Sequence, residues 1–319
     1  MADSVTFEDV QAAAHRIAGS IRRTPVVTSR ALDELAGRHL YFKCENLQRA
    51  GAFKIRGAMN AVALVKALGR TRLVATHSSG NHGAALALAA REGGLDAVVV
   101  MPENSAAPKI AAVARYGAEV LLCKPGRVAR EAALAEVVRD RGAEVVHPYD
   151  DARVIAGQGT ATLELLAECA DLDALIVPVG GGGLLAGTLV AARGLRPDLP
   201  VFAAEPAQAD DAARSLATGE RVLLDAPDTV ADGLRASLGV LNFDLILDFC
   251  RGIVTVSEEE IVAAMRRFLE STKLLIEASS AVPVAALLAR RLPAEYKRVG
   301  VVITGGNVDL DRLPWRTSA

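Results

Sequence analysis

The sequence predicts an α/β protein of two domains, in which parallel sheets are flanked by helices. Short runs rich in β-branched residues alternate with longer Ala-rich runs, a rhythm typical of βαβ units. The chain has 319 residues, enough for about two domains. Hydrophobic residues make up 51% of it, which supports a sizeable core and argues against disorder.

The elements can be placed in order along the chain. The first helix is expected over 6–21, because Thr6 is a suitable N-cap, acidic residues follow it, and Pro25 comes soon after its end. Further helices are expected at 58–66, 84–90, 108–116, 127–141, 157–169, 184–193, 258–270 and 280–291. Strands are expected at 40–45, 73–76, 97–101, 119–123, 144–147, 174–179, 201–204 and 298–304.

The Ala/Val-rich block 71–149 is expected to form its own small α/β domain. It would be inserted into a larger domain made from residues 1–70 and 150–319.

Charge and cysteine content exclude several functions. There are 36 Lys and Arg against 38 Asp and Glu, with no block of like charge, so we expect neither a nucleic-acid nor a membrane partner. The four cysteines are scattered and form no CxxC pair, which favours reduced thiols in a cytoplasmic protein. The first residues have neither a basic nor an apolar region of the signal-peptide type, and no stretch has the length of a membrane span.

Lys54 lies in the stretch Gln48-Arg-Ala-Gly-Ala-Phe-Lys-Ile-Arg-Gly57, where a loop turns into a helix. An ammonium group there meets the positive end of the helix dipole, which disfavours its charge. Such a lysine can serve as an amine nucleophile, although a solvated charge is the ordinary interpretation of this position.

The turn Gly180-Gly-Gly-Gly183 separates a strand from a helix. Successive glycines let the backbone approach an anion closely, and the helix N-terminus favours negative charge, so the turn predicts a phosphate site. Gly181, Gly183 and Ala186 also fit a dinucleotide fingerprint, with Glu205 about 20 residues further on. A nicotinamide oxidoreductase is therefore the alternative from another class.

A second turn, Ser78-Ser-Gly-Asn-His-Gly83, also joins a strand to a helix. Its hydroxyls and free N–H groups suit a carboxylate, although Ser78 and Ser79 could simply cap the helix. One lysine, one phosphate cradle and one carboxylate nest together suggest pyridoxal phosphate (PLP) with an amino-acid substrate.

The sequence resembles the fold-type II PLP enzymes (tryptophan synthase β-like), specifically the serine/threonine ammonia-lyase (dehydratase) and serine racemase group. The resemblance covers almost the whole chain. It rests on Lys43-Cys-Glu-Asn46, Ala52-Phe-Lys-Ile-Arg-Gly57, Thr76-His-Ser-Ser-Gly-Asn-His-Gly83, Ile155-Ala-Gly-Gln-Gly-Thr160, Gly180-Gly-Gly-Gly-Leu184, Ala204-Glu-Pro206, Ala231-Asp-Gly233 and Thr304-Gly-Gly-Asn-Val-Asp309.

The resemblance implies roles for individual residues. Lys54 would form the Schiff base, Asn81 would bond the ring hydroxyl, and Thr304 would face the pyridine nitrogen. The implied cofactor contacts are Phe53, Lys54, Asn81, Gly180, Gly181, Gly182, Gly183, Leu184, Gly233, Glu277 and Thr304. The implied substrate contacts are Ser78, Ser79, Asn81, His82 and Arg130.

The resemblance also implies a divalent-cation site formed by Glu205, Asp211 and the Ala209 carbonyl. Its oxygen-only ligands suit Mg²⁺, or else Ca²⁺ or Mn²⁺. The alternative is a solvated acidic loop.

The implied activity is the elimination of the β-hydroxyl of L-threonine or L-serine, which gives a 2-oxo acid and ammonia. Lys54 would remove the α-proton, and a hydroxyl partner such as Thr304 would leave the pyridine nitrogen unprotonated. Ser79, on the opposite face of the ring, would allow racemisation, so a serine racemase stays an alternative. A 3-hydroxyaspartate ammonia-lyase is another, with Arg130 or the metal as the extra cation.

Some positions depart from the family pattern. Tyr149 stands where the animal racemases carry Asn, which favours the lyase. Glu277-Ala-Ser-Ser-Ala-Val-Pro283 differs from the usual Glu-Pro-Ser-Gly-Ala. Its departures Ala278, Ser280 and Pro283 bring the loop shape, and hence the selection of substrate size, into question. The sequence ends soon after Trp315, so no regulatory domain and a catabolic role are expected. The family implies a homodimer.

Overall fold

The computed structural model describes residues 5–225 and 227–315. Its strands are β1 (Val26–Val27), β2 (His39–Cys44), β3 (Leu73–His77), β4 (Asp96–Pro102), β5 (Glu119–Cys123), β6 (Glu144–Val145), β7 (Ala174–Pro178), β8 (Val201–Pro206), β9 (Gly252–Val256) and β10 (Arg298–Ile303). Its α-helices are α1 (Phe7–Ile17), α2 (Arg30–Ala36), α3 (Lys54–Leu68), α4 (Asn81–Gly93), α5 (Ala107–Arg115), α6 (Arg127–Arg141), α7 (Ala152–Glu168), α8 (Gly183–Leu195), α9 (Asp211–Thr218), α10 (Val240–Phe249), α11 (Glu258–Thr272) and α12 (Ala278–Leu288).

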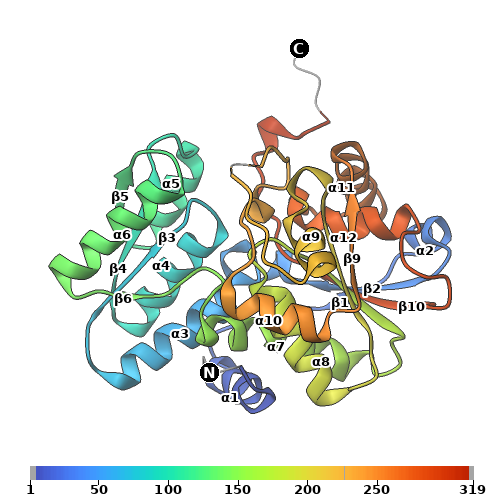
Figure 1. Cartoon of the computed structure of the whole chain (residues 1–319), viewed down its shortest axis with the longest axis horizontal. Helices are drawn as coiled ribbons and strands as arrows, with labels where there is room; N and C mark the ends of the chain where they lie inside the picture. The colour runs from blue at the N-terminus through green and yellow to red at the C-terminus, as the bar shows by residue number, and fades with distance from the viewer. Residues whose placement is uncertain (1–4, 226, 316–319) are drawn as a thin grey trace.

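The larger sheet has six strands in the order β1-β2-β10-β7-β8-β9, and all of its pairs are parallel except β1 with β2. Alternate residues of its strands face opposite sides, as the pleat requires. Leu40, Phe42, Ile176 and Val301 pack against α11 and α12, whereas Val177 and its neighbours pack against α7 and α8. The sheet is thus covered on both faces, with α11 and α12 above it and α7 and α8 below (Figure 1).

The smaller sheet has four parallel strands in the order β5-β4-β3-β6. Helices α4 and α5 cover one of its faces, where Val74 and Val99 are buried, and α6 covers the other, where Val98 and Val100 are buried. It forms the left part of Figure 1, beside the larger sheet. The two sheets confirm the α/β class with parallel sheets, whereas the domain boundaries near 70 and 150 stay a prediction.

Several elements differ from the sequence expectation. Helix α1 begins after a Thr6 capping box with Asp9, as expected, but it ends at Ile17 and not at residue 21. Helix α7 begins five residues before residue 157, because the Asp151 side chain caps it by accepting from Arg153 N. The elements α2, α9, α10, β1 and β9 had no prediction. The α10 sequence is apolar on most sides and therefore lacks the 3.6-residue period that marks an amphipathic helix.

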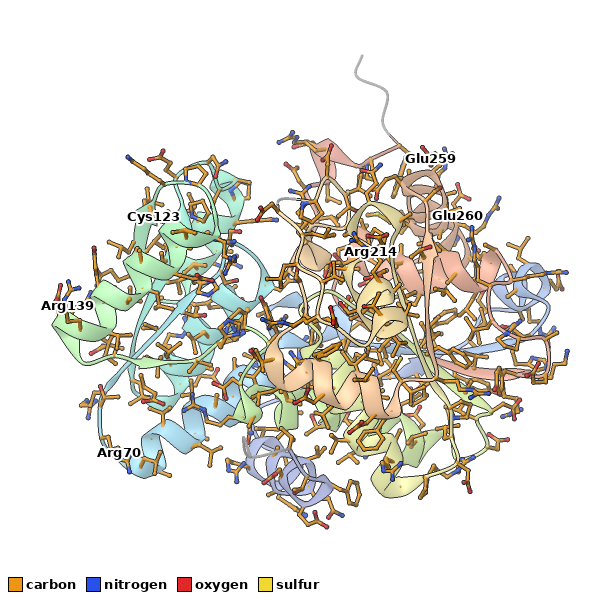
Figure 2. The ribbon with its side chains drawn as sticks, in the orientation of Figure 1. Arg70, Cys123, Arg139, Arg214, Glu259 and Glu260 are labelled. Carbon is orange, nitrogen blue, oxygen red and sulfur yellow. The ribbon has the colours of Figure 1, made fainter. Side chains whose placement is uncertain are left out.

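Charged side chains such as Arg70 and Arg139 point outward from the ends of α3 and α6 (Figure 2). The four cysteines are unpaired, as expected, and burial raises the pKa of the Cys44 thiol to about 12. Within the described ranges, no helix combines the length and apolar character needed to cross a membrane.

Candidate active site

The residues singled out in the sequence gather at the carboxyl edge of the larger sheet. Thr304 follows β10, the Gly180–Gly183 turn follows β7 closely, and Lys54 comes ten residues after the end of β2. These three strands are adjacent and parallel, so the segments after them meet at one edge.

Lys54 is the first residue of α3 and lies partly buried. Its Nζ donates a 2.8 Å hydrogen bond to the Pro148 carbonyl and lies 5.1 Å from the centre of the Phe53 ring. Burial lowers the pKa of Lys54 to about 8, against the opposing effect of the Glu277 charge. The other lysine of this region, Lys43, is fully buried, donates to the Thr24 carbonyl and pairs with Glu164. Lys54 is therefore the available amine.

We expect the reaction of apoenzyme with PLP to follow the neutral fraction of Lys54, because only the neutral amine attacks an aldehyde. Its rate should rise about tenfold per pH unit below pH 8 and level off above it. Removing the Glu277 charge in Glu277→Gln should lower the Lys54 pKa and shift the inflection to lower pH. Stopped-flow absorbance measures the rate. An inflection near pH 10 in wild type would contradict the prediction.

The N-terminus of α3 is held by a buried ion network. Arg56 forms two-pronged hydrogen bonds with Glu45, at 2.8 and 2.7 Å, and with Glu164, at 2.8 and 2.9 Å. Arg56 and Glu45 are fully buried, and Glu164 also accepts from Lys43. Two cations thus balance two carboxylates just behind Lys54, which fixes where α3 begins.

The glycine turn leads directly into α8. Gly182 has φ 91°, a left-handed conformation that favours glycine. A Cβ on Gly181 would lie 2.4 Å from the Tyr149 ring, and one on Gly180 would lie 2.8 Å from Leu234 Cα. The Gly181 carbonyl accepts from Asn242 Nδ2 at 2.7 Å, so it is turned away from the helix start. The turn therefore presents N–H groups at a helix N-terminus, a site that favours phosphate.

We expect Gly182→Ala to weaken PLP binding at least about tenfold, because a left-handed non-glycine residue costs about 1–2 kcal/mol. The added Cβ would also lie 2.8 Å from Asn242 Cβ. Equilibrium dialysis of apoenzyme measures the effect. Gly19→Ala is the matched control, since its Cβ meets no described atom within 4 Å. Equal affinities in the two variants would refute the prediction.

The second turn offers free N–H groups at the start of α4. Its N-cap is Gly80, and no described side chain caps it, so Ser78 and Ser79 are not N-caps. Ser78 Oγ instead accepts from Gly80 N at 3.3 Å. The ring of His82 is buried, and its Nε2 lies 3.2 Å from the Val146 carbonyl. The ring of His82 thus points toward Val146, whereas its main-chain N–H lies at the start of α4; its place beside the substrate carboxylate stays a prediction.

Asn81 connects the nest with α12. Its Nδ2 lies 3.0 Å from both carboxylate oxygens of Glu277, and its Oδ1 accepts from Asn307 Nδ2 at 2.9 Å. Burial raises the pKa of Glu277 to about 7. The Gly233 carbonyl lies beside Gly180, and Gly233 N donates to Ser279 Oγ at 3.0 Å. These contacts bring Asn81, Glu277 and Gly233 to the carboxyl edge of the larger sheet, where the glycine turn lies.

Thr304 has a buried hydroxyl partner, Ser280. Their oxygens lie 2.8 Å apart, and both residues are buried. The sequence marked Ser280 only as a departure from the family pattern. Neither this pairing nor the Asn242 contact with the glycine turn could be read from sequence, because both join segments far apart in the chain.

Arg130 of α6 faces the same region from the small sheet. Burial lowers the pKa of His77, and the nearby charge of Arg130 lowers it further. His77 packs edge-on against His147, and His147 against Tyr149, with ring centres 5.4 and 4.6 Å apart. The Arg130 guanidinium thus lies near the His77–His147–Tyr149 row of packed rings, whose last member, Tyr149, contacts the glycine turn.

The expected metal ligands are close together and buried. Glu205 accepts from Ala212 N and Ala213 N at 3.2 and 2.6 Å, and Asp211 accepts from Leu238 N at 3.3 Å. Burial, with Asp211 nearby, raises the pKa of Glu205 to about 8. Burial likewise raises the pKa of Asp211 to about 6. No Lys or Arg of the described residues pairs with either carboxylate. The donor set therefore fits a hard divalent cation, held by two carboxylates and a carbonyl.

Across the described ranges there is no group of three or more His, Cys, Asp or Glu that could hold a metal. Any cation at Glu205 and Asp211 would thus need the Ala209 carbonyl and water.

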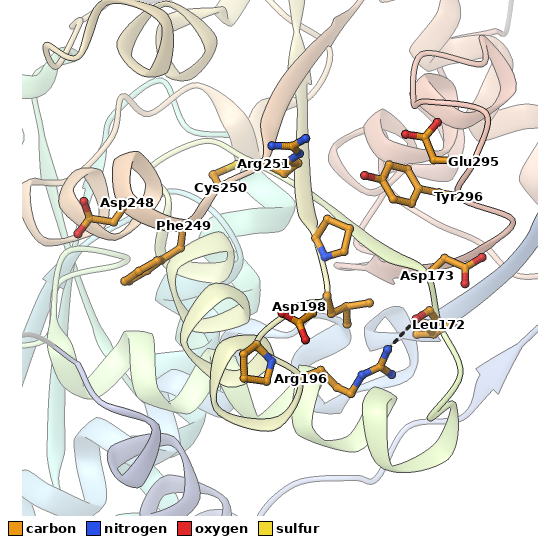
Figure 3. Close-up of a pocket in the computed structure, with 13 residues that line it drawn as sticks. Leu172, Asp173, Arg196, Asp198, Asp248, Phe249, Cys250, Arg251, Glu295 and Tyr296 are labelled. Carbon is orange, nitrogen blue, oxygen red and sulfur yellow. Dashed lines mark hydrogen bonds between the residues drawn. The ribbon is translucent and has the colours of Figure 1, made fainter.

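A separate cleft of about 740 Å³ lies at the opposite edge of the larger sheet (Figure 3). Its lining includes Asp173, Arg251 and Tyr296, which precede β7, β9 and β10, and Arg196, which bonds the Leu172 carbonyl. Lys54 and the glycine turn are not among its lining residues. It is therefore not the candidate active site.

Comparison with known proteins agrees with this geometry. The profile of the family described as "Pyridoxal-phosphate dependent enzyme" matches residues 17–305. The chain is 47% identical over 310 residues to a β-hydroxyaspartate dehydratase of Paracoccus denitrificans (strain Pd 1222), covering 97% of this chain and 98% of the relative. It is 45% identical over 314 residues to a serine racemase of Dictyostelium discoideum, covering 97% of each. The crystal structure of a threonine deaminase from T.th. superimposes with a TM-score of 0.90 at 42% identity, covering 95% of this chain and 99% of that one.

The chain therefore belongs to the fold-type II family of pyridoxal-phosphate-dependent enzymes. Its similarity is to the racemases, dehydratases and deaminases of that family. The site fits the cofactor. Three features meet at the carboxyl edge of the larger sheet. They are a partly buried amine of lowered pKa, a glycine turn packed too closely for any Cβ, and a buried hydroxyl pair. Lys54, the glycine turn and Thr304 would hold PLP there.

Proposed function

We propose that the protein is a PLP-dependent ammonia-lyase that removes water from a β-hydroxy amino acid, with L-threonine and L-serine as substrates. PLP, when bound, supplies an electron sink for the charge left at Cα. The N–H groups at the start of α4 would hold the substrate carboxylate. Lys54 would take the α-proton, since its lowered pKa keeps part of it neutral near pH 7.

The reaction then balances without a further reactant. The Cα–H electrons form the new C=C bond as the β C–O bond breaks, and the proton held on Lys54 can join the departing hydroxyl as water. The released enamine hydrolyses to a 2-oxo acid and ammonia. Magnesium at Glu205, Asp211 and the Ala209 carbonyl would stabilise the segment that leads into α9.

The observation that favours elimination over racemisation is that the Ser79 hydroxyl lacks a hydrogen-bond partner among the described residues. Racemisation needs a second proton carrier opposite Lys54, the position that the family resemblance gives to Ser79. Its hydroxyl has no hydrogen-bond partner among the described residues, so no neighbouring base increases its basicity. Lys54 is then the better base of the two.

A second candidate substrate is 3-hydroxyaspartate. Arg130 lies near the His77–His147–Tyr149 row and could pair with a second carboxylate. The similarity to a β-hydroxyaspartate dehydratase supports this candidate.

A substrate panel distinguishes the candidates. Purified enzyme is given L-Ser, D-Ser, L-Thr and both 3-hydroxyaspartate diastereomers, and 2-oxo acid and chirality are followed together. Oxo acid from L-Thr and L-Ser supports the proposal, whereas D-Ser forming faster than pyruvate would replace it with a racemase. Turnover of 3-hydroxyaspartate alone, lost in Arg130→Met but kept in Arg139→Met on the same helix, would establish the second candidate.

Metal binding should change the pH dependence of stability. Glu205 and Asp211 have folded pKa values of about 8 and about 6, above their ordinary values, so the folded state holds extra protons. Without metal, the free energy of unfolding should therefore fall as pH rises from about 4 to 8. Mg²⁺ at a hundredfold excess over Kd should add about 2.7 kcal/mol at pH 8. Thermal melts with Mg²⁺ or EDTA measure this, and an equal Mg²⁺ effect in Glu205→Gln would contradict the site.

A further inference from the structure

Asn242 contacts the glycine turn from the first turn of α10, where it is fully buried. Its Nδ2 donates to the Gly181 carbonyl at 2.7 Å and to the Tyr149 carbonyl at 3.0 Å. These two acceptors identify the nitrogen, because Oδ1 in its place would set lone pairs against lone pairs. A primary amide has two N–H hydrogens, and each carbonyl takes one of them.

The other side-chain atom of Asn242, Oδ1, is buried without a partner among the described residues. A buried carbonyl oxygen that has lost its water and gained no donor is unfavourable. An apolar side chain of the same branched shape would leave no such atom. Packing alone therefore does not account for an asparagine here, whereas its two N–H hydrogens do.

The start of α10, which carries Asn242, is held in place by Asp150. The Asp150 carboxylate accepts from Val240 N and Leu241 N, each at 2.9 Å. Gly239 N, just before the helix, donates to the Gly181 carbonyl at 3.1 Å. The Gly181 carbonyl thus has two donors on the α10 side, and both of its lone pairs are used.

Fixing the Gly181 carbonyl also fixes an N–H group of the turn. The peptide unit between Gly181 and Gly182 is planar and trans, so its C=O and N–H point in opposite directions. The Gly182 N–H therefore points away from α10. Gly182 is buried, and its N–H has no hydrogen-bond partner among the described residues. Since buried N–H groups are almost always paired, this one indicates a ligand acceptor on its side.

The glycines cannot set this direction by themselves. Glycine adopts left-handed and right-handed backbone conformations about equally readily, so a run of four allows the Gly181–Gly182 peptide to face either way. In the reversed orientation a carbonyl oxygen would replace the N–H, and its negative end would repel an anion. A contact from outside the turn must therefore select the orientation.

We propose that Asn242 is a positioning residue for the phosphate of PLP. Its two hydrogens hold the Gly181 carbonyl toward α10, and the Gly182 N–H is thereby presented to the phosphate. Asn242 acts only through the turn, because its own hydrogens are used on the two carbonyls. This inference rests on the proposed function, since it takes PLP as the bound cofactor.

A comparison of PLP with pyridoxal tests the role of Asn242. Pyridoxal has the same ring and aldehyde but no phosphate, so the ratio of the two Kd values isolates the phosphate contacts. Equilibrium dialysis of apoenzyme measures both. Asn242→Leu keeps the branched shape and removes both hydrogens. It should weaken PLP binding about tenfold, the effect of losing two ordinary hydrogen bonds, and leave pyridoxal binding unchanged.

The matched control is Asn60→Leu. Asn60 is buried in α3, and its Nδ2 donates to the Arg153 carbonyl at 2.6 Å. This variant removes a comparable buried bond without touching the glycine turn, so it should keep the wild-type ratio of Kd values. A second variant, Asn242→Asp, has the same shape but offers at most one hydrogen. It should also weaken PLP and spare pyridoxal, and it serves if Asn242→Leu does not fold.

Two outcomes would overturn the inference. One is wild-type affinity for PLP in the Asn242 variants. The other is an equal loss of affinity for PLP and pyridoxal, because a general disturbance of the site does not depend on the phosphate. Failure of wild type to bind PLP would instead overturn the proposed function, so the two failures are distinguishable.

Discussion

Replacing Lys54 with alanine is expected to lower turnover by about 10³-fold or more, because a positioned general base contributes about 10²–10⁴ and no other amine can replace it. Lys43, the nearest competitor in sequence, is buried and paired with Glu164. Turnover of L-Thr and L-Ser by the PLP-loaded variant measures the loss. Borohydride should fix PLP to the peptide that contains Lys54 in wild type and to no peptide in the variant.

Lys66→Ala is the matched control for this prediction. Lys66 lies in the last turn of the same helix, α3, and is exposed to solvent. Its removal should leave both turnover and the fixed peptide unchanged. If Lys54→Ala retained most of the activity, or if borohydride labelled another lysine, the assignment of Lys54 as the base would be wrong.

The second large effect is expected at Arg56. Arg56→Met should lower the free energy of unfolding by about 3–5 kcal/mol, because it leaves the fully buried Glu45 without its cation. Glu164 would keep Lys43, so the loss falls mainly on Glu45. Urea unfolding followed by circular dichroism measures the change.

Arg266→Met controls for the loss of an arginine. Arg266 pairs with Glu270 on the surface of α11 with 60% of its side chain exposed, so its removal should cost less than about 1 kcal/mol. Similar losses in the two variants would show that the Arg56 network is no more stabilising than a surface pair.

The parts of the site that sequence could predict are those set by local structure. The Gly180–Gly183 turn follows β7 and leads into α8, as the strand and helix patterns indicated. Lys54 lies at the junction of loop and helix, as expected, although α3 begins at Lys54 and not at residue 58. Short runs rich in β-branched residues likewise placed most strands of both sheets. These features depend on neighbours within a few residues, so the sequence carries them directly.

The remaining features depend on contacts between distant segments. Thr304 and Ser280 are 24 residues apart, and Asn242 reaches the Gly181 carbonyl across 61 residues. The ring of His82 lies against the Val146 carbonyl, 64 residues further along the chain. Such orientations follow from packing, and no local pattern encodes them.

The position of β10 has a consequence for the synthesis of the chain. This strand lies between β2 and β7 in the larger sheet, yet it is translated after all the other strands of the described residues. Until they leave the ribosome, the two flanking strands keep open edges at which other chains can pair. All strands of the smaller sheet have emerged by then. Nascent chains halted before residue 298 should thus carry an ordered small sheet beside an incomplete, aggregation-prone one, and a chaperone would bind them there.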